Sequence, residues 1–387
     1  MLPSMRGQPL LIPPGRTLGI LGGGQLGRML ALEARRLGYR IAVFSPVQDA
    51  PAGQIADIEV IAPYTNEEAL RTFARRVDVV TLEFENVPVR AVEVVAEHTI
   101  VRPSVEALRV AQDRVLEKSF FREIGLACVP FAPITSEEEL RRALTAMGGS
   151  GVLKTRRSGY DGKGQCRIED AHALGDARAL IAQGECILEG FAPFTRELSV
   201  VAARAVDGSI ADHGVMENIH RDHILDITIA PARVPDEVKA RAIAMTHTLI
   251  ERLEYVGVLC LELFLLADGT LLANEFAPRP HNSGHVTLDA CATDQFSQQM
   301  RAVCGLPLGP TAQYRPAVMV NLLGHMWPAG KEPDWGRALR TPGAKLHLYG
   351  KQEIKRGRKM GHLTALGETI DEALERAQQA RNALFGW

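Results

Sequence analysis

The chain contains 387 residues, of which 46% are hydrophobic, so it is long enough to form two or three domains with cores of their own. A formal net charge of −2 argues against non-specific electrostatic binding to nucleic acid or to an anionic membrane surface. Residues 1–16 lack the apolar core of a secretory signal, and the most apolar stretch, residues 256–266, is too short to span a bilayer. The six cysteines form no CxxC pair, which is typical of free thiols in a reducing compartment, so we expect a cytoplasmic protein.

Strands and helices alternate over roughly the first 110 residues. Short apolar runs predict buried strands, and stretches with helical periodicity connect them. The predicted strands are residues 17–21, 39–44 and 78–82, and the predicted helices are residues 25–38 and 67–75. This alternation predicts an open parallel α/β sheet, and we assign residues 1–111 to a Rossmann-like N-terminal domain.

Glycines follow the first predicted strand in the pattern G-x-G-x-x-G, at Gly22, Gly24 and Gly27. This position between a strand and a helix suits a dinucleotide site, which would indicate an oxidoreductase. The ribose-binding Asp or Glu of such sites should end the second strand, but residues 44–46 read FSP. We therefore favour a turn that receives another phosphate or sugar at the helix N-terminus, with a purely structural turn as the alternative.

A second unit begins near Gln112 and mixes helices with strands. The predicted elements are a helix at 113–124, strands at 151–155, 186–189 and 197–205, a helix at 235–253, and a hairpin that pairs 257–265 with 271–276. We expect an α+β domain at residues 112–308, divided into two subdomains near residue 189, and a small C-terminal domain at residues 309–387.

Two acidic residues stand in otherwise apolar strands of the predicted hairpin. Glu262 lies on one strand and Glu275, preceded by Asn274, lies on its partner. An unpaired charge in such a strand is costly, and carboxylates on adjacent strands can share one face and bind Mg²⁺ together with nucleotide phosphates. The alternative is that both carboxylates are solvated on an exposed face.

A lysine and a glycine-rich loop suggest a phosphate site. Lys154 ends the apolar run GVLKT, where a partly buried ammonium needs an anionic partner. The following loop, residues 158–165, contains three glycines and Lys163, and glycines let backbone N–H groups approach phosphates closely. An ordinary surface loop would have a similar composition.

Two histidines four residues apart, His281 and His285, could suggest a zinc pair. Pro280 and Gly284 argue against the helix that such a pair requires, and no HExxH is present. We expect His285 to be a structural histidine.

Together these segments resemble the ATP-grasp superfamily and, within it, the 5-(carboxyamino)imidazole ribonucleotide synthetases, also described as the ATPase subunit of phosphoribosylaminoimidazole carboxylase. The resemblance rests on GILGGGQLGRM (19–29), TLEFENVP (81–88), RPS (102–104), QDR (112–114), SGYDGKGQ (158–165), NEFAPRPHNSGH (274–285), HLYGK (347–351) and GRKMGHL (357–363). It covers almost the whole chain, and NEFAPRPHNSGH is its most specific part. It implies an ATP-grasp fold with an N-terminal pre-ATP-grasp domain and a small C-terminal domain.

The resemblance also implies a nucleotide site between the two α+β subdomains. Its residues would be Arg114, Lys154, Gly159, Tyr160, Asp161, Gly162, Lys163, Gly164, Gln165, Glu189, Gly190, Phe191, Ala192, Glu197, His220, Asn274 and Glu275. In this set Lys154 would meet the α-phosphate, Glu197 would bind the ribose, and Glu262 with Glu275 would hold magnesium. Arg114 replaces a lysine of the wider superfamily, as the narrower family does, whereas the hinge at 189–193 departs from the usual family pattern.

A second implied site takes a ribonucleotide monophosphate that carries an aminoimidazole. Its residues would be Gln25, Leu26, Glu83, Tyr160, Asp161, Arg279, His281, Asn282, Ser283, Lys351 and Arg358, with Glu85 as a further candidate. The catalytic residues would be Lys154, Arg279 and His281, with His281 as a proton acceptor.

The implied reaction joins ATP, bicarbonate and 5-aminoimidazole ribonucleotide through carboxyphosphate, as in de novo purine (IMP) biosynthesis. ATP and Mg²⁺ would be the cofactors, bicarbonate a co-substrate, and the chain a homodimer. The rival functions are another ATP-grasp enzyme, such as a formate-dependent glycinamide ribonucleotide transformylase or a biotin-type carboxylase, a dinucleotide-dependent oxidoreductase, and a catalytically silent binding protein.

Overall fold

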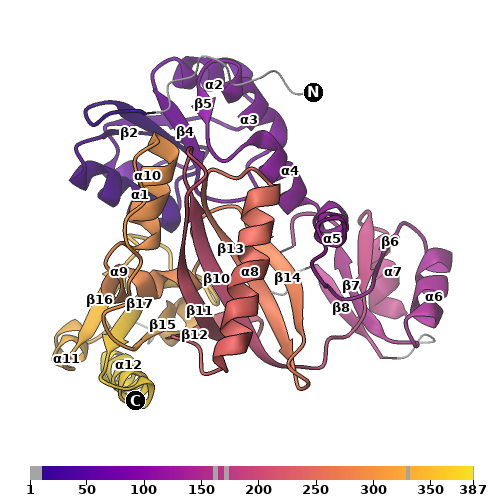
Figure 1. Ribbon diagram of the computed structural model, residues 1–387. Coiled ribbons are helices and arrows are strands. Elements are labelled where there is room, and N and C mark those ends of the chain that lie inside the picture. Colours follow the sequence, from indigo (N-terminus) through magenta and orange to yellow (C-terminus); the bar gives the residue numbers. More distant parts are fainter. Residues whose placement is uncertain (1–10, 160–163, 170–173, 328–331, 387) are drawn as a thin grey trace.

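The computed structural model describes residues 11–159, 164–169, 174–327 and 332–386. Three β-sheets organise these residues, and Figure 1 shows the N-terminal sheet at the top, the largest sheet in the centre and a small sheet at the right. Within the described part of the chain, no helix combines the length and hydrophobicity needed to span a bilayer.

The N-terminal sheet contains five parallel strands in the order β3-β2-β1-β4-β5. Its elements are β1 (Thr17–Leu21), α1 (Gln25–Arg36), β2 (Arg40–Ser45), η1 (Gly53–Ile55), β3 (Ile58–Ile61), α2 (Glu67–Ala74), β4 (Val79–Leu82), α3 (Val89–Ala96), β5 (Ile100–Val101) and α4 (Val105–Gln112). Side chains of α1 form a core on one face of the sheet, and those of α2 and α3 form a core on the other. The predicted parallel α/β unit is confirmed, although α1 ends two residues early because Gly38 has a positive φ of 80°.

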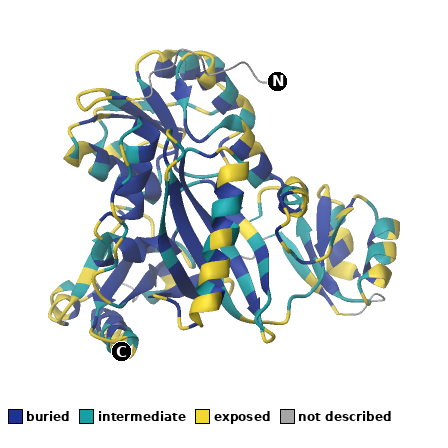
Figure 2. Cartoon of the chain, viewed as in Figure 1, coloured by how far each residue is buried: buried dark blue, intermediate teal, exposed yellow. Residues whose placement is uncertain are grey.

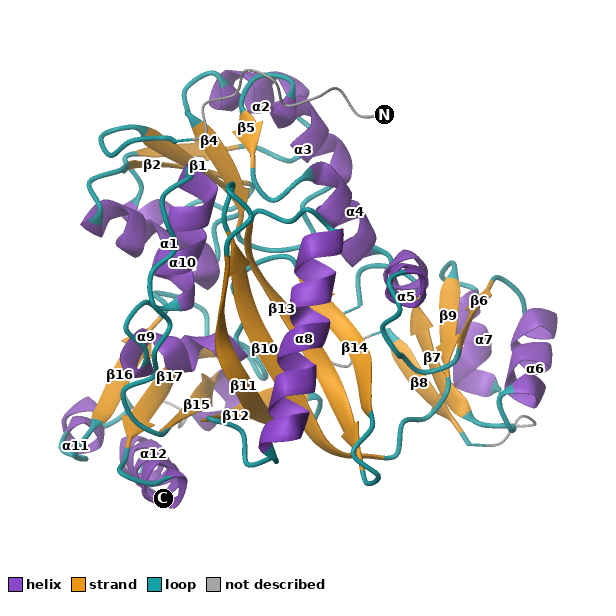
Figure 3. Cartoon of the chain, in the orientation of Figure 1, coloured by secondary structure: helices purple, strands orange, loops and turns teal. Residues whose placement is uncertain are grey.

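The small sheet is antiparallel, with the order β6-β9-β7-β8. Its elements are α5 (Arg114–Glu123), β6 (Phe131–Ile134), α6 (Glu137–Ala146), β7 (Gly151–Thr155), β8 (Gln165–Ile168), α7 (Gly175–Ile181) and β9 (Cys186–Glu189). Helices α6 and α7 share a core with one face of this sheet. Helix α5 lies between the small and large sheets, so it contacts both halves of the predicted nucleotide site (Figure 3).

The large sheet has eight strands in the order β14-β13-β10-β11-β12-β15-β17-β16. Its strands are β10 (Phe194–Arg204), β11 (Ile210–Arg221), β12 (Ile224–Ala230), β13 (Gly257–Leu266), β14 (Leu271–Ala277), β15 (Ala317–Leu323), β16 (Ala344–Leu348) and β17 (Lys359–Leu366). The remaining helices are α8 (Asp236–Arg252), η2 (Ser283–Val286), α9 (Thr287–Ala290), α10 (Gln295–Cys304), η3 (Gly324–Met326), α11 (Trp335–Leu339) and α12 (Ile370–Phe385). The C-terminal strands β15 to β17 therefore extend the same sheet that carries the predicted hairpin of β13 and β14.

The two faces of the large sheet differ in character. Helix α8 packs on one face through a large apolar core, and its outer side is exposed (Figure 2). The other face carries polar side chains in register on adjacent strands, because Thr228 pairs with Asn218, Glu197 pairs with Asn218, and Ser199 pairs with Glu262. The candidate site lies on this polar face.

Candidate active site

The two predicted metal ligands lie opposite each other on neighbouring strands. Glu262 of β13 and Glu275 of β14 are direct cross-strand partners, so both side chains project from one face of the sheet. Asn274 is an extra residue in β14 beside this pair, and such a β-bulge re-aims the side chains next to it. Desolvation by the surrounding protein raises the pKa of Glu275, and the neighbouring Glu262 carboxylate raises it further. Two carboxylates in this arrangement favour a shared cation.

The carboxylate pair fits Mg²⁺ better than a metal held by protein alone. Among the described residues, no group of three or more His, Cys, Asp or Glu could enclose a metal ion. Magnesium needs no such cage, since it keeps several waters and shares its shell with substrate phosphates beside one or two carboxylates. The Glu275 carboxylate makes no hydrogen bond or ion pair with another described residue, so its oxygens are available to a ligand.

Two successive residues of α5 hold the strand that carries Glu275. The buried Lys118 Nζ donates to the carbonyl of Asn274 at 2.5 Å, and Glu117 Oε1 accepts from the amide of Phe276 at 2.7 Å. These contacts bind the peptide groups on either side of Glu275 along the outer edge of β14, which ends the sheet. Helix α5 therefore fixes the bulge.

Lys154 and Glu189 form an ion pair at the end of the small sheet. Lys154 Nζ lies 2.8 Å from Glu189 Oε2, and Lys118 Nζ lies 3.8 Å from the other carboxylate oxygen. Burial of Glu189 would raise its pKa, but the two ammonium groups outweigh burial and lower it. The predicted anionic partner of Lys154 thus includes a protein carboxylate, which the sequence pattern did not reveal.

Arg114 contacts the base of the predicted phosphate loop. Its guanidinium donates to the carbonyl of Gly159 at 2.8 Å, and the amide of Thr155 donates to the carbonyl of Gly164 at 2.8 Å. Gly164 has a φ of 69°, which favours glycine at that turn, and Gln165 begins β8. The predicted loop residues Tyr160, Asp161, Gly162 and Lys163 lie outside the described residues.

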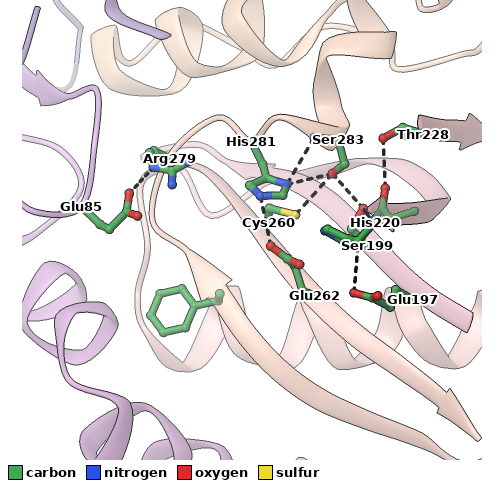
Figure 4. Close-up of polar contacts among 12 residues, drawn as sticks. Glu85, Glu197, Ser199, His220, Thr228, Cys260, Glu262, Arg279, His281 and Ser283 are labelled. Atoms are coloured by element: carbon green, nitrogen blue, oxygen red, sulfur yellow. Dashed lines mark hydrogen bonds and ion pairs between the residues drawn. The ribbon is translucent and has the colours of Figure 1, made fainter. Parts of the chain in front are cut away.

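The predicted ribose contacts lie side by side on β10 and β11. His220 Nδ1 is 3.0 Å from Glu197 Oε2 (Figure 4). Burial would lower the pKa of His220, but Glu197 and Glu262 raise it. In the hinge that leads to them, the Gly190 amide donates to the Pro130 carbonyl at 2.8 Å.

The hinge continues through Phe191 and Ala192 to β10. The Arg167 guanidinium stacks over the Phe191 ring at 4.5 Å. Neither Phe191 nor Ala192 makes a backbone hydrogen bond within the described part of the chain, so their peptide groups are available to a ligand.

The loop after β14 presents the predicted acceptor residues. Arg279 forms an ion pair with Glu85 of the N-terminal domain and donates to the Pro280 carbonyl at 3.1 Å. Asn282 is 9% exposed, and neither its amide oxygen nor its amide nitrogen has a hydrogen-bond partner among the described residues. A buried amide without partners is costly, so a bound ligand would satisfy it.

His281 lies between Glu262 and Ser283. Its Nε2 is 3.0 Å from Glu262 Oε1, and its Nδ1 is 2.9 Å from Ser283 Oγ (Figure 4). Burial would lower the pKa of His281, but Cys260 and Glu262 raise it. Ser283 is fully buried, and its hydroxyl also accepts a hydrogen bond from Ser199 Oγ at 2.8 Å.

His285 is buried and bonded within the protein. Its Nδ1 is 3.0 Å from Gln295 Nε2, and its ring stacks on His362. The sequence argued against a helix here, and the structure has one 3₁₀ turn, η2, which leaves His281 and His285 with separate partners.

Glu83 fills the N-terminal glycine turn. Its carboxylate accepts from the amides of Gly24 at 2.8 Å and Gly27 at 3.2 Å, at the start of α1. A Cβ on Gly24 would lie 2.6 Å from Glu83 Oε1, so glycine permits this approach. The Glu83 carboxylate thus occupies the helix N-terminus, the position where the pyrophosphate of a dinucleotide would bind. Gln25 and Leu26 begin α1 directly after this turn.

The two predicted acceptor residues of the C-terminal domain, Lys351 and Arg358, lie in the segment between β16 and β17. Lys351 Nζ donates to the Lys359 carbonyl at 2.8 Å. Burial raises the pKa of Glu83, and the positive charges of Arg279 and Lys351 partly offset this rise. Arg358 instead donates to the Glu353 carbonyl at 3.0 Å, and no described contact joins it to the other predicted site residues.

Models of three protein families match consecutive parts of the chain. They are the ribonucleotide synthetase preATP-grasp domain at residues 16–112, the ATP-grasp domain at residues 119–296 and the phosphoribosylaminoimidazole carboxylase C-terminal domain at residues 317–376. The N5-carboxyaminoimidazole ribonucleotide synthase of Bacillus subtilis is 44% identical over 365 residues, which cover 94% of this chain and 95% of that protein. This chain belongs to the N5-carboxyaminoimidazole ribonucleotide synthase family.

Solved structures of N5-carboxyaminoimidazole ribonucleotide synthases have the same fold. A crystal structure of an N5-carboxyaminoimidazole ribonucleotide synthetase with ADP has a TM-score of 0.90 at 43% identity and covers 96% of this chain and 97% of that chain. The Aspergillus clavatus enzyme in complex with ADP and 5-aminoimidazole ribonucleotide has a TM-score of 0.87 at 32% identity, with 96% and 98% covered. The predicted family, the ATP-grasp fold with its N- and C-terminal domains, and the class of ATP-dependent ligase are confirmed. The alternative of an oxidoreductase and that of another ATP-grasp ligase are not favoured.

Buried residues that support the site carry little signal in the sequence. Glu117 and Lys118 were unremarkable positions in a predicted helix, and their only sequence signal is charge on the face shared with the buried Phe121. Ser199 left no signal at all, because a serine in a strand is common and its hydrogen-bond partners depend on strand register.

Proposed function

We propose that this chain catalyses the ATP- and bicarbonate-dependent carboxylation of 5-aminoimidazole ribonucleotide to N5-carboxyaminoimidazole ribonucleotide in de novo purine (IMP) biosynthesis. The observation that carries the proposal is the pairing of Glu262 with Glu275 beside Lys154, with the loop of Arg279, His281 and Asn282 at the same face. The carboxylate pair and the nearby cations suit MgATP, and bicarbonate would be the co-substrate.

ATP would lie between the small and large sheets. Lys154 and Arg114 lie on the side of the small sheet, and their positive charges lower the pKa of Glu275. Phosphates held through Mg²⁺ beside Glu262 and Glu275 would therefore also lie close to these two cations. The hinge at residues 189–192 would face the adenine, and Glu197 with His220 would face the ribose. Magnesium supplies neutralisation of phosphate charge and orientation of the reacting phosphoryl group. Asn274 and the loop at residues 159–165 complete the proposed nucleotide site.

The acceptor nucleotide would lie between the N-terminal turn, the loop after β14 and the C-terminal strands. Arg279, Asn282 and Lys351 would hold its polar groups, with Glu83 near the ribose. Gln25, Leu26, Ser283, Arg358, Tyr160 and Asp161 remain further proposed contacts, of which Tyr160 and Asp161 lie outside the described residues.

The chemistry follows from positioning and charge. A bicarbonate oxygen attacks the γ-phosphorus of ATP, the bond to ADP breaks, and carboxyphosphate forms. The exocyclic amine then attacks the carboxyl carbon, phosphate leaves with the C–O bonding electrons, and the amine loses a proton. Arg279 and Lys154 offset the negative charge that develops, and His281 is positioned to take the proton once its Nε2 is free of Glu262.

Phosphate release from ATP tests the proposal. Purified protein should release phosphate only when bicarbonate and 5-aminoimidazole ribonucleotide are both present, with one carboxylated nucleotide formed per phosphate. Glycinamide ribonucleotide with formate serves as the control substrate pair. Turnover of that pair instead of the imidazole nucleotide would reject the proposal in favour of the transformylase.

We also propose that the chain works as a cytoplasmic homodimer and that its domains span residues 1–111, 112–308 and 309–387. The free cysteines, three of them buried, are consistent with a reducing compartment. Sedimentation of the purified chain would give its oligomeric state.

A further inference from the structure

The residues on either side of Lys351 are bonded to the N-terminal domain. Gln54 Nε2 donates to the Gly350 carbonyl at 3.1 Å. The side-chain amide of Gln352 donates to the Asp49 carboxylate. Asp49 and Gln54 both belong to the segment between β2 and β3. The backbone that carries Lys351 is therefore held, before and after that residue, by a domain to which it does not belong.

Arg28 of α1 determines which way the Gln54 amide points. Its Nη1 donates to Gln54 Oε1 at 2.9 Å and to the Pro51 carbonyl at 3.0 Å. Because a guanidinium can only donate, the amide oxygen of Gln54 faces Arg28 and the amide nitrogen faces the other way. On that side Nε2 meets the carbonyls of Gly350 and Asp49, which can only accept. Every donor and acceptor between Arg28 and Gly350 is thus determined.

Gly350 allows the two domains to approach this closely. Its φ is 71°, a conformation that favours glycine. A Cβ added at this position would lie 2.7 Å from Gln54 Oε1 and 3.3 Å from Arg28 Nη1. A larger residue would therefore displace the Gln54 amide, and the contact is a close fit of the two domains rather than a loose meeting of surface side chains.

The opposite side of the segment is bonded to β17 and its first residues. Tyr349 is 1% exposed, its amide donates to the Met360 carbonyl at 3.0 Å, and its hydroxyl oxygen lies 2.8 Å from His362 Nδ1. Lys351 Nζ donates to the Lys359 carbonyl at 2.8 Å. A phosphate oxygen is a stronger acceptor for an ammonium than a neutral carbonyl is, so the Lys351 side chain can turn to a phosphate while its backbone stays in place.

We propose that Arg28 and Gln54 are positioning residues that hold Lys351 in place for the phosphate of the acceptor nucleotide. This inference rests on the proposed function through the place of Lys351 in the acceptor site. Arg28 orients the Gln54 amide, Gln54 holds the peptide group that precedes Lys351, and the Lys351 ammonium meets the phosphate. The N-terminal domain thus supports a binding group that the C-terminal domain supplies.

The exposure of these contacts argues against a role in stability alone. Gln54 is exposed, and so are its hydrogen bonds to Arg28 and Gly350. Bonds of this kind contribute little to the free energy of unfolding, since water replaces them when the protein unfolds. Their effect is to order the segment before the ligand arrives, which reduces the entropy cost of binding.

Substitutions of Gln54 test the inference on the intact protein. Gln54→Leu removes the bonds of the side-chain amide, whereas Gln54→Glu keeps an acceptor for Arg28 but has no donor for the Gly350 carbonyl. Each should raise KM for 5-aminoimidazole ribonucleotide roughly fivefold, the size expected of one ordinary hydrogen bond. The kcat and KM for ATP should stay within about twofold. Arg28→Met should raise the same KM by a similar factor.

Gln313→Leu is the matched control. Gln313 Nε2 also donates to two backbone carbonyls, those of Ala230 and Arg315, each at 2.8 Å. None of these three residues belongs to the proposed acceptor site. This variant should keep KM for the imidazole nucleotide even where its Tm falls.

A double-mutant cycle shows whether Gln54 acts through Lys351. Lys351→Met should by itself raise KM for the imidazole nucleotide by about tenfold or more. In that background Gln54→Leu should have no further effect, because no ammonium remains to be positioned. An equal effect of Gln54→Leu with and without Lys351 would overturn the inference.

The other outcomes separate this inference from the proposed function. Unchanged KM for the imidazole nucleotide in both Gln54 variants, or in Lys351→Met, would overturn the positioning role while leaving the function intact. An effect of Arg28→Met without one of Gln54→Leu would also overturn it, as would an equal rise of KM for ATP. A parent protein that does not turn over the imidazole nucleotide would reject the proposed function and the inference with it.

Discussion

Two pairs of glutamates in this chain look alike in sequence and differ in what they bind. Glu83 and Glu85 follow an apolar strand of the N-terminal sheet, and Glu262 and Glu275 interrupt apolar strands of the large sheet. Protein groups satisfy the first pair, through the amides of the glycine turn and through the ion pair with Arg279. In the second pair, Glu262 has one histidine partner and Glu275 has no hydrogen-bond or ion-pair partner among the described residues.

The difference indicates which of these four carboxylates are free to bind an external ion. A carboxylate already bonded by its own chain contributes to the fold and positions its neighbours. A carboxylate raised in pKa by another carboxylate, with no cation of the protein paired to it, is suited to an external ion. Substitutions that remove a charge or a supporting contact at one pair or the other therefore test the distinction.

The largest effect should follow from Glu275→Gln. The amide keeps the shape of the side chain but weakens binding of the divalent ion, so turnover should fall by about a hundredfold or more. Phosphate release measured across a magnesium titration checks this, with circular dichroism to establish the fold. Near-normal turnover at low magnesium would remove Glu275 from the metal site.

A smaller loss should follow when the support behind Glu275 is removed. Lys118→Met deletes the donor to the Asn274 carbonyl, so the bulge loosens and KM for MgATP should rise roughly tenfold. KM for the imidazole nucleotide should change little. Arg122→Met is the control, since Arg122 is exposed on the same helix and stacks over the Phe131 ring. Equal changes in both KM values would indicate general loosening instead.

Glu85→Gln should affect stability more than turnover. Burial would raise the pKa of Glu85, but Arg279 outweighs burial and holds it at about 2. Because the folded pKa is below the unfolded value, this pair stabilises the protein fully above about pH 4.5, and the contribution is lost as pH falls toward 2. The variant should lose up to about 3 kcal/mol of unfolding free energy at pH 7. Its stability should also change less between pH 4.5 and 2 than that of the parent, which urea titrations at several pH values would detect.

The smallest effect should come from Gly24→Ala. The added Cβ would lie 2.6 Å from Glu83 Oε1, so the carboxylate must shift, at a cost of about 1–3 kcal/mol. Gly175→Ala is the control, since nothing lies within 4 Å of its Cβ and alanine favours a helix. Thermal melts should show a lower Tm for the first variant and no loss for the second.

Much of the fold could be predicted from local patterns. Strands β1, β7 and β9 have the predicted bounds, and the hairpin of β13 and β14 brings Glu262 and Glu275 together as its turn requires. These features depend on short apolar runs and glycine turns, which a sequence displays directly. The resemblance to a known family supplied the rest of the site.

The supporting contacts could not be predicted because they join segments far apart in sequence. The bond between Lys118 and Asn274 spans 156 residues, and that between Ser199 and Ser283 spans 84. Each depends on strand register and helix rotation together. For the same reason Glu83, expected to contact the acceptor, was not expected to cap the glycine turn.

The addition of β15, β17 and β16 to the large sheet determines which parts of the molecule can move independently. A C-terminal unit joined by a backbone ladder cannot swing as a hinged lid, so any opening and closing around ATP would fall to the small sheet of β6 to β9. Truncating the chain before Ala317 would also leave β12 with an unpaired edge, a template for adhesion between copies. Shortened forms of this protein should therefore aggregate rather than persist as a smaller enzyme.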